Sequence, residues 1–427
     1  MHILYVSQYF PPEVGAPQAR VSELSRAWVK AGHTVHVLTG MPNYPTGELP
    51  EEYRGRVLAR EVFDAVNVVR TWIYATPNKK IVRRSLAYVS YALSAVSLGQ
   101  WFAPAPDVVV ATSPPILVAL AGFLIARLRG APFVFEVRDL WPESIVAVGA
   151  LPEGHRAVAA MRSLEEFLYR EADRIVVVTE SFRERLRDRG VPEGKISVVT
   201  NGVDLERFSP AAEGNAPDAD AELREELGLA PEHVVCSYVG TLGMAHGLHA
   251  VLDVAARARA AEPALRFLFV GEGAEKSKLE ARARDEGLDN VVFLGQQRRD
   301  RMPSLYRISD VCLVPLRKSE LFTTVIPSKM FEIMAMERPL VISVDGEARR
   351  IVERSGGGLF APPEDVDAML EAIRSLARSP ALREEMGRAG RSFVEREYDR
   401  DALAGRYLEV LAEVAGAPAA AREGASS

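Results

Sequence analysis

The chain has 427 residues, which is too long for one ordinary hydrophobic core and predicts two or three domains. It is 48% hydrophobic and 26% charged, as is usual for a globular protein. The formal net charge of −6 argues against bulk nucleic-acid binding, because no overall basic field would attract a polyanion.

Three features of the chain bear on its compartment. The two cysteines, Cys236 and Cys312, lie inside apolar runs, so we expect them to be buried and reduced, as in a cytosolic protein. The N-terminus has no basic region before its first strand pattern, so no signal peptide is expected. The stretch 86–102 is weakly apolar but carries three serines and a glutamine, which makes it too polar to span a bilayer.

Short β-branched runs alternate with helical patterns along the whole chain, which is typical of parallel sheets with crossover helices. In the first half, strands are predicted over 2–7, 34–39, 66–71, 107–112, 133–138, 174–179 and 196–200, with a helix over 17–30. Residues 209–226 have no apolar periodicity and predict a linker or an exposed loop.

The alternation starts again in the second half. Strands are predicted over 234–240, 266–271, 290–295, 311–316 and 340–344, followed by one amphipathic helical stretch from about 381 to 415. The sequence therefore predicts two doubly wound α/β domains, over 1–205 and 206–385. A C-terminal helix, 386–415, could return to the first domain, and a disordered tail, 416–427, follows. Ligands of such sheets bind beyond the carboxyl ends of the strands, so the loops there carry the candidate residues.

The segment KMFEIMAM, 329–336, is the most informative one. A helix that is apolar nearly all round is buried, yet it contains Glu332. The carboxylate could simply favour the helix start through the dipole, or it could accept hydrogen bonds from sugar hydroxyls. Ser328 is a plausible N-cap, and the free N–H groups around Ser328 and Lys329, together with the lysine cation, suit a diphosphate.

Glycines follow a strand in two places. Gly240, Gly243 and Gly247 occur in YVGTLGMAHG, where they fit either a structural turn or a phosphate loop, since the spacing is not a dinucleotide fingerprint. The loop 11–20 is similar, with Gly15 before a helix start and Arg20 about one turn later.

The segment EVRDLWPES, 136–144, places four charged residues at the end of a predicted strand. They are Glu136, Arg138, Asp139 and Glu143. Such a group could form an ion-pair network that holds the loop, or a polar wall on the acceptor side of an active site.

A basic and apolar segment covers 78–102. Four cations precede a stripe of apolar residues: Lys79, Lys80, Arg83 and Arg84, then Leu86, Val89, Leu93 and Val96. This order suits a helix lying on an anionic membrane, while burial of the stripe in a core is the alternative.

Together these segments resemble the family 4 glycosyltransferases of the GT-B fold, which have two facing Rossmann-like domains with a cleft between them. Within that family the chain is most similar to the bacterial N-acetyl-L-fucosamine transferases of surface-polysaccharide assembly. The resemblance rests on YFPPEVGAPQARVSELSRAW, EVRDLWPES, NGVDLERF, YVGTLGMAHGL and LFTTVIPSKMFEIMAMERPLVIS, and covers nearly the full length.

The resemblance implies a retaining enzyme without an obligatory metal or cofactor. Its C-terminal domain would bind a nucleotide diphosphate sugar, most simply UDP-linked, and its N-terminal domain a glycan or polyprenyl-linked acceptor. By position, Glu332 would hold the ribose, Ser328 and Lys329 would meet the phosphates, and Gly15 would lie near the diphosphate. The enzyme would be cytoplasmic and peripheral on the inner membrane face.

The chain departs from the family pattern at its cations and carboxylates. Thr324 stands where the first glutamate of the family's pair belongs, and Thr241 and His246 stand where an arginine and a lysine bind phosphate. Arg138 replaces a frequent histidine. Lys329, or else Arg138, would then neutralise the leaving diphosphate, and Asp139 would orient the acceptor or the sugar.

Two other functional classes stay open from the sequence. A sugar-nucleotide 2-epimerase has the same fold and no acceptor. A non-catalytic sugar-nucleotide-binding subunit would tolerate Thr324 and Thr241.

Overall fold

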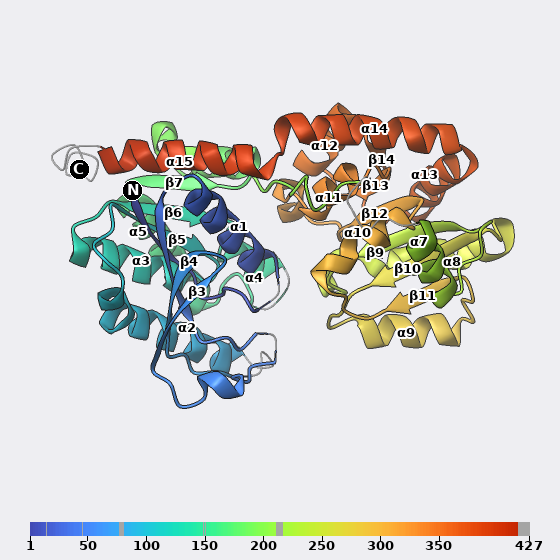
Figure 1. Cartoon of the computed structure of the whole chain (residues 1–427). Coiled ribbons are helices and arrows are strands. Elements are labelled where there is room, and N and C mark those ends of the chain that lie inside the picture. The colour runs from blue at the N-terminus through green and yellow to red at the C-terminus, as the bar shows by residue number, and fades with distance from the viewer. Residues whose placement is uncertain are drawn as a thin grey trace. The chain divides into compact units, whose positions relative to one another are not determined.

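The protein is described by a computed structural model, which covers residues 1–13, 15–44, 46–76, 81–147, 149, 151–210 and 217–416. It forms two compact units (Figure 1). Unit 1 comprises Met1–Thr200 with Asp401 onward, and unit 2 comprises Asn201–Arg400. The expected disordered tail lies outside the described residues from position 417 on.

Unit 1 is an eight-stranded sheet in the order β3-β4-β2-β1-β5-β6-β7-β8, in which only the edge pair β3–β4 is antiparallel. Its strands are β1 His2–Val6, β2 Thr34–Gly40, β3 Leu58–Phe63, β4 Val66–Thr71, β5 Val108–Ser113, β6 Phe133–Val137, β7 Arg174–Val177 and β8 Ile196–Val198. Its helices are α1 Ala16–Lys30, α2 Ile81–Ser97, α3 Ile116–Arg129, α4 Glu143–Ala147, α5 Arg156–Glu171, α6 Glu180–Asp188 and α15 Arg400–Gly416. Short 3-10 turns are η1 Glu51–Tyr53, η2 Gly99–Phe102 and η3 Glu193–Lys195.

Unit 2 is a six-stranded parallel sheet in the order β11-β10-β9-β12-β13-β14. Its strands are β9 Val234–Val239, β10 Leu265–Val270, β11 Val291–Leu294, β12 Val311–Pro315, β13 Leu340–Ser343 and β14 Gly358–Phe360. Its helices are α7 Pro217–Glu226, α8 Leu248–Ala261, α9 Lys276–Asp285, α10 Met302–Arg307, α11 Lys329–Ala335, α12 Glu347–Ser355, α13 Val366–Arg378 and α14 Pro380–Glu397. Its 3-10 turns are η4 Met244–His246, η5 Arg299–Arg301 and η6 Leu321–Thr324.

Both units confirm the expected doubly wound α/β class. Central strands such as β5 are buried along their whole length, because helices cover both faces of a parallel sheet. In each sheet the strand order reverses beside the first strand, between β1 and β5 in unit 1 and between β9 and β12 in unit 2. These reversals are the topological switch points at which such sheets bind ligands. Cys236 and Cys312 are buried and free, as expected.

Three predictions of secondary structure were wrong or incomplete. The supposed linker contains α7, whose Leu223 is buried and whose Arg224 donates to the carbonyl oxygens of Ile308 and Ala230. The edge strands β3 and β14 were missed. The first alternates exposed and half-buried side chains, and the second has only three residues.

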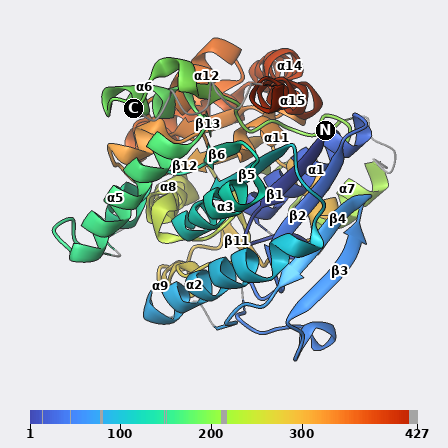
Figure 2. The ribbon, with the colours of Figure 1, turned by 90° about the vertical axis from the view of Figure 1, so that its left-hand side faces the viewer.

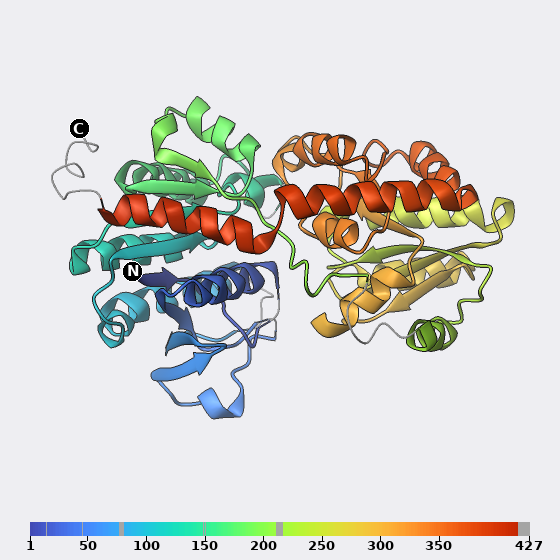
Figure 3. The same cartoon turned by 45° about the horizontal axis from the view of Figure 1, so that its top comes forward.

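The single helix expected over 381–415 is two helices, α14 and α15. The amide of Val203 donates to the Tyr398 carbonyl and the Arg400 amide donates to the Val203 carbonyl, at 2.9 and 3.1 Å, and this pairing interrupts the helix. α15 then lies along unit 1 near α1 (Figure 3), where the Trp28 indole donates to the Ala404 carbonyl at 3.2 Å. The Trp28 and Tyr407 rings pack edge to face, 5.3 Å apart.

Candidate functional site

The candidate donor site lies at the switch point of unit 2. The turn after β9 carries Gly240, Thr241 and Gly243, and the chain after β12 leads through η6 to α11. Because β9 and β12 are adjacent parallel strands, their carboxyl ends meet at the same edge of the sheet. Two segments that are distant in sequence therefore come together there, as the sequence analysis expected.

The Lys329 ammonium is the central charge of this site. Its Nζ lies 3.9 Å from the centre of the Tyr238 ring and so close to Gly240 that a Cβ at that position would collide with it. Although the residue as a whole is only half-buried, Nζ is buried and has no hydrogen-bond partner among the residues that the structure describes. Burial lowers the pKa of Lys329 to about 7, against the opposing effect of Glu332. A buried ammonium without a partner is costly and suits an anionic ligand.

The glycine turn is held open by its backbone conformation. Gly240 and Gly247 have φ of +143° and +59°, which other residues rarely adopt. The Tyr238 hydroxyl donates to the carbonyl oxygen of Thr241 at 2.7 Å, and the Thr241 side chain is exposed. Gly243 precedes η4, with His246 Nδ1 3.5 Å from the place of a Cβ.

His246 does not supply the positive charge at this turn. Burial and the neighbouring Lys329 lower the pKa of His246 to about 4, so its ring is neutral at pH 7. Its Nδ1 is buried and has no hydrogen-bond partner in the described part of the chain. His246 can therefore offer a hydrogen bond to a ligand, while Lys329 offers the charge.

The start of α11 differs in detail from the expectation. Ser328 occupies the N-cap position, but its side chain does not cap the helix. Its Oγ instead accepts a hydrogen bond from Asn201 Nδ2 at 3.0 Å. Thr324, which replaces a family glutamate, donates its hydroxyl to the Leu321 carbonyl at 2.7 Å.

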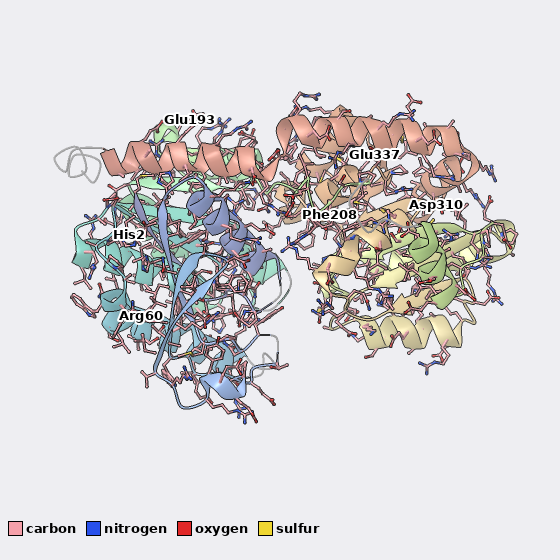
Figure 4. All side chains as sticks on the ribbon, viewed as in Figure 1. His2, Arg60, Glu193, Phe208, Asp310 and Glu337 are labelled. Atoms are coloured by element: carbon pink, nitrogen blue, oxygen red, sulfur yellow. The ribbon has the colours of Figure 1, made fainter. Side chains whose placement is uncertain are left out.

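Glu332 is the half-buried carboxylate of an otherwise buried helix, as the sequence predicted. Its Oε2 accepts a hydrogen bond from the Tyr306 hydroxyl at 3.0 Å. The Tyr306 ring is itself braced by Phe208, labelled in Figure 4, with centroids 6.2 Å apart. The hydrogen bond from Tyr306 thus orients the Glu332 carboxylate. Neither the helix-dipole interpretation nor the sugar-binding interpretation of the sequence predicted this contact.

The candidate acceptor site lies at the switch point of unit 1. Gly15 is the N-cap of α1 and has an extended backbone; the place of a Cβ there lies 2.6 Å from Gln18 Oε1. That oxygen is buried, and none of the described residues forms a hydrogen bond with it. Gly15 therefore begins a helix beside a polar atom that is available to a ligand.

A buried ion-pair network fixes the end of β6. Glu136 is fully buried and accepts hydrogen bonds from Tyr5 at 2.6 Å and Arg20 at 2.8 Å. Burial alone would raise the pKa of Glu136, but Arg20 and then Arg138 outweigh it and the pKa is lowered. Arg20 also donates to the carbonyl oxygens of Val199 and Thr200. The ion-pair interpretation of this segment is therefore correct for Glu136.

Arg138 and Asp139 follow β6 directly. Arg138 Nε donates to Thr112 Oγ1 at 2.5 Å and lies 3.9 Å from Glu136, so the side chain is held at the ends of β5 and β6. Burial raises the pKa of Asp139 to about 6, although hydrogen bonding to Ser144 and the charge of Arg138 oppose the shift. A carboxylate with this pKa can exchange a proton near neutral pH.

Glu143 forms an ion pair with Arg189, which also pairs with the buried Glu165 at 2.9 Å. Glu143 therefore takes part in an ion-pair network, which is the structural alternative that the sequence left open for the segment 136–144. Its second oxygen, Oε2, is buried and has no hydrogen-bond partner within the described ranges.

An aromatic cluster at the candidate acceptor site was missed by the sequence analysis. The Tyr9 and Tyr44 rings pack edge to face at 5.6 Å, and Tyr88 and Trp141 do so at 6.4 Å. A side-chain hydrogen bond joins Tyr9 and Tyr88. Three of the four residues follow β1, β2 and β6, so tyrosine or tryptophan after successive strand ends was the available signal.

The stripe of α2 is exposed rather than buried. Leu86 is 50% exposed and Leu93 65%, and Val89 is also exposed, whereas Val96 packs against the core. Core burial of the whole stripe is therefore excluded. Arg83 is exposed and Arg84 half-buried, while Lys79 and Lys80 lie outside the described residues.

Two absences hold for the part of the chain that the structure describes. None of its helices has the length and apolar character needed to cross a membrane. No group of three or more His, Cys, Asp or Glu side chains there is arranged to hold a metal ion.

Two protein families match the chain, one over each half. A glycosyl transferase 4-like domain matches residues 15–202, and the glycosyl transferases group 1 family matches residues 219–393. The first match contains Gly15, Arg138 and Asp139 of the candidate acceptor site, and the second contains Gly240, Lys329 and Glu332 of the candidate donor site.

Full-length relatives are glycosyltransferases. The chain is 26% identical over 417 residues to a glycosyl transferase assigned to colanic acid biosynthesis, WcaI of Escherichia coli (strain K12), covering 96% of this chain and 99% of that one. It superposes on sucrose-phosphate synthase from Thermosynechococcus elongatus with a TM-score of 0.72 at 20% identity, covering 97% and 98% of the two chains. Anabaena HepE in complex with UDP and glucose also gives 0.72, at 16% identity and 96% and 99% coverage. These structural matches confirm the GT-B fold.

Proposed function

Since the chain is a glycosyltransferase of the GT-B fold, with a family 4-like domain followed by a group 1 domain, we propose that it transfers a sugar from a UDP-linked donor, with retention at the anomeric carbon. The acceptor is a glycan or a lipid-linked saccharide of cell-surface polysaccharide synthesis. The sugar is a hexose or an N-acetylated amino sugar, as in the N-acetyl-L-fucosamine transferases that the sequence resembles. The colanic acid assignment of WcaI and the UDP in the HepE structure support these choices.

The observation that carries this proposal is the Lys329 ammonium beside Gly240. It is buried at the switch point of unit 2, and no described residue accepts a hydrogen bond from it. A diphosphate there would supply the missing partner, and the neutral His246 would add a hydrogen bond. Glu332, held by Tyr306, would accept hydrogen bonds from the ribose hydroxyls.

The transfer reaction requires a positive electrostatic potential around the leaving diphosphate. As the bond from the sugar to the diphosphate breaks, negative charge grows on the phosphate oxygens, and Lys329 stabilises it without rearranging. In a front-face retaining transfer the leaving phosphate itself takes the proton of the acceptor hydroxyl, so no further base is required. Arg138 and Asp139, fixed at the end of β6, orient the acceptor and the sugar.

The acceptor places the enzyme at the inner face of the cell membrane. A lipid-linked acceptor is confined to a bilayer, and α2 offers an exposed apolar stripe with Arg83 beside it. An amphipathic helix of this kind binds in the interface plane without spanning the bilayer.

Calorimetry and product analysis test the proposal. UDP-, GDP- and dTDP-sugars are titrated into the wild type and the Lys329→Met variant. Of the three donors, the UDP-sugar is expected to bind the wild type most tightly, and Lys329→Met is expected to lose this tight binding. The preferred donor is then incubated with lipid extracted from bacterial membranes, and the products are analysed. Transfer of sugar to lipid supports the proposal, whereas interconversion of the nucleotide sugar without acceptor, or binding without turnover, contradicts it.

A further inference from the structure

The exposed apolar side chains of unit 1 are concentrated on two neighbouring helices and the turn between them. α2 and α3 pack against each other and lie side by side on one face of the unit (Figure 2). Besides the stripe of α2, Trp101 in η2 is 63% exposed and Leu128 on α3 is 60% exposed. Phe102 and Leu124 are exposed as well. Isolated exposed hydrophobics are normal, but a concentration like this one marks an interaction surface.

The positions on each helix form a single face. Leu86, Val89 and Leu93 are three and four residues apart on α2, and Leu124 and Leu128 are four apart on α3, so each set lies along one side of its helix. The opposite side of each helix carries buried residues of the unit 1 core, such as Tyr91 and Ala126. The outer sides are therefore not required for the fold of unit 1.

The charge around this face is strongly one-sided. Residues 65–135 contain one acidic residue, Asp107, and seven basic ones. Arg70 is buried and paired with Glu61, and Arg127 is paired with Glu171. The other five are Lys79, Lys80, Arg83, Arg84 and Arg129. The whole chain has a net charge of −6, so the basic surplus of this region is opposite in sign to the rest. Asp107 accepts a hydrogen bond from the His2 amide at 2.7 Å, at the start of β5. Neither α2 nor α3 contains an acidic residue.

Two arginines of α3 lie beside exposed or aromatic side chains of the same face. The Arg129 guanidinium lies 5.6 Å from the centre of the Trp101 ring, and its NH2 donates to the Ala103 carbonyl at 3.0 Å. Arg127 is largely exposed next to Leu128, lies over the ring of Phe123, and forms an ion pair with Glu171 at 3.1 Å. Trp101 thus has an aromatic ring open to the outside and a cation that fixes its position.

We propose that the outer face of α2, η2 and α3, with Trp101 and Leu128 as its anchors, inserts into the headgroup region of an anionic phospholipid bilayer. The positive charge at the edge of this face indicates that its partner is an anionic bilayer. Arginines at the edge of an apolar face are attracted to an anionic leaflet, from which the remaining acidic surface is repelled. A tryptophan suits the boundary between headgroups and acyl chains, and helices of this kind lie about 5–10 Å deep.

This surface extends the membrane contact beyond the α2 segment, and it makes a different prediction from charge attraction alone. Attraction between charges falls with added salt, whereas the transfer of apolar area from water does not. Binding to anionic vesicles should therefore weaken at high salt but persist. The part that persists should depend on Trp101 and Leu128.

Flotation with phosphatidylethanolamine–phosphatidylglycerol vesicles tests the proposal on the full-length chain. Trp101→Ser and Leu128→Gln are each expected to lower the partition coefficient about tenfold, the size expected for a large apolar side chain that leaves the bilayer. The matched control is Val62→Ser, because Val62 is 69% exposed on the edge strand β3, outside α2, η2 and α3, and its loss should change nothing. Phosphatidylcholine vesicles should bind the wild type far more weakly.

A second measurement reports on depth. Lipids brominated near the headgroup should quench tryptophan fluorescence of the wild type, and Trp101→Phe should remove most of that quenching. Binding of both Trp101→Ser and Leu128→Gln at wild-type strength would overturn the proposal. Quenching of wild-type strength in Trp101→Phe would also overturn the proposal. A dimer that forms without lipid and that Leu128→Gln dissociates would overturn it as well. Flotation does not depend on turnover, so failure of the glycosyl transfer proposal would show in the donor titration and leave these results intact.

Discussion

Replacing Lys329 by Met tests the donor site most directly, because it removes a buried charge while keeping a similar length of side chain. A unit charge at about 4 Å from a phosphate oxygen is worth about 4 kcal/mol at the effective dielectric of protein sites. The nucleotide sugar should therefore bind about two to three orders of magnitude more weakly to Lys329→Met. Isothermal titration calorimetry measures the loss, and Lys318→Met, an exposed lysine on the chain that leads to η6, is the control.

The pH dependence of binding gives a sharper test of the same charge. Burial lowers the pKa of Lys329 to about 7 in the empty site, and a bound diphosphate would raise it. Binding above pH 7 then requires uptake of one proton, so affinity is full below pH 7 and falls above it. The dissociation constant should rise about fivefold from pH 7 to pH 8 and about fiftyfold from pH 7 to pH 9.

The slope must come from Lys329 and not from the ligand. A nucleotide sugar is the right titrant, because its diphosphate diester does not titrate near neutrality. Lys329→Met should bind with no such slope. A flat profile in the wild type, or the same slope in both proteins, would refute the assignment of Lys329 to the diphosphate.

Three further predictions follow from the same geometry. Glu332→Gln should weaken nucleotide binding by about 1–3 kcal/mol in calorimetry, the usual loss for a hydrogen bond to a charged group; unchanged affinity in a folded variant would remove Glu332 from the ribose site. Asp139→Asn should lower kcat while the melting temperature stays within a few degrees, and it should remove the rise of wild-type activity through about pH 6, where Asp139 loses its proton. Tyr44 is 41% exposed at the edge of the aromatic cluster, so Tyr44→Ala should raise the KM for the acceptor several-fold and leave donor binding unchanged; an effect on the donor alone would contradict an acceptor role.

The sequence alone predicted much of the architecture. The runs that became β1, β2, β4, β9 and β12 are short, continuous and rich in β-branched residues, which favours strands buried in a parallel sheet. The apolar octet 329–336 predicted a buried helix, and its glutamate stood out because buried carboxylates need partners. Gly240 could also be singled out, since a glycine directly after a strand often allows a close backbone approach.

Contacts between distant segments decided the rest. The break between α14 and α15 depends on Val203, nearly two hundred residues earlier, whose backbone pairs with Tyr398 and Arg400. α7 forms because the Leu223 side chain becomes buried. The composition of residues 209–226 does not predict this burial. In the same way, the exposure of Leu86 and Leu93 could not be read from the stripe, which suited a core equally well.

The protonation states of Lys329 and His246 show most clearly what the sequence determines and what the tertiary structure determines. The residues at the start of the 329–336 helix pointed to Lys329 as a candidate cation, and the family resemblance placed His246 in the phosphate-binding turn. Which of them carries a proton at pH 7 depends on how far each is removed from water and on what lies opposite. The packing of β9 beside α11 sets both, placing the Lys329 ammonium over Tyr238 and leaving His246 neutral. Local periodicity is a property of the sequence, whereas burial and protonation are set by segments that only the folded chain brings together.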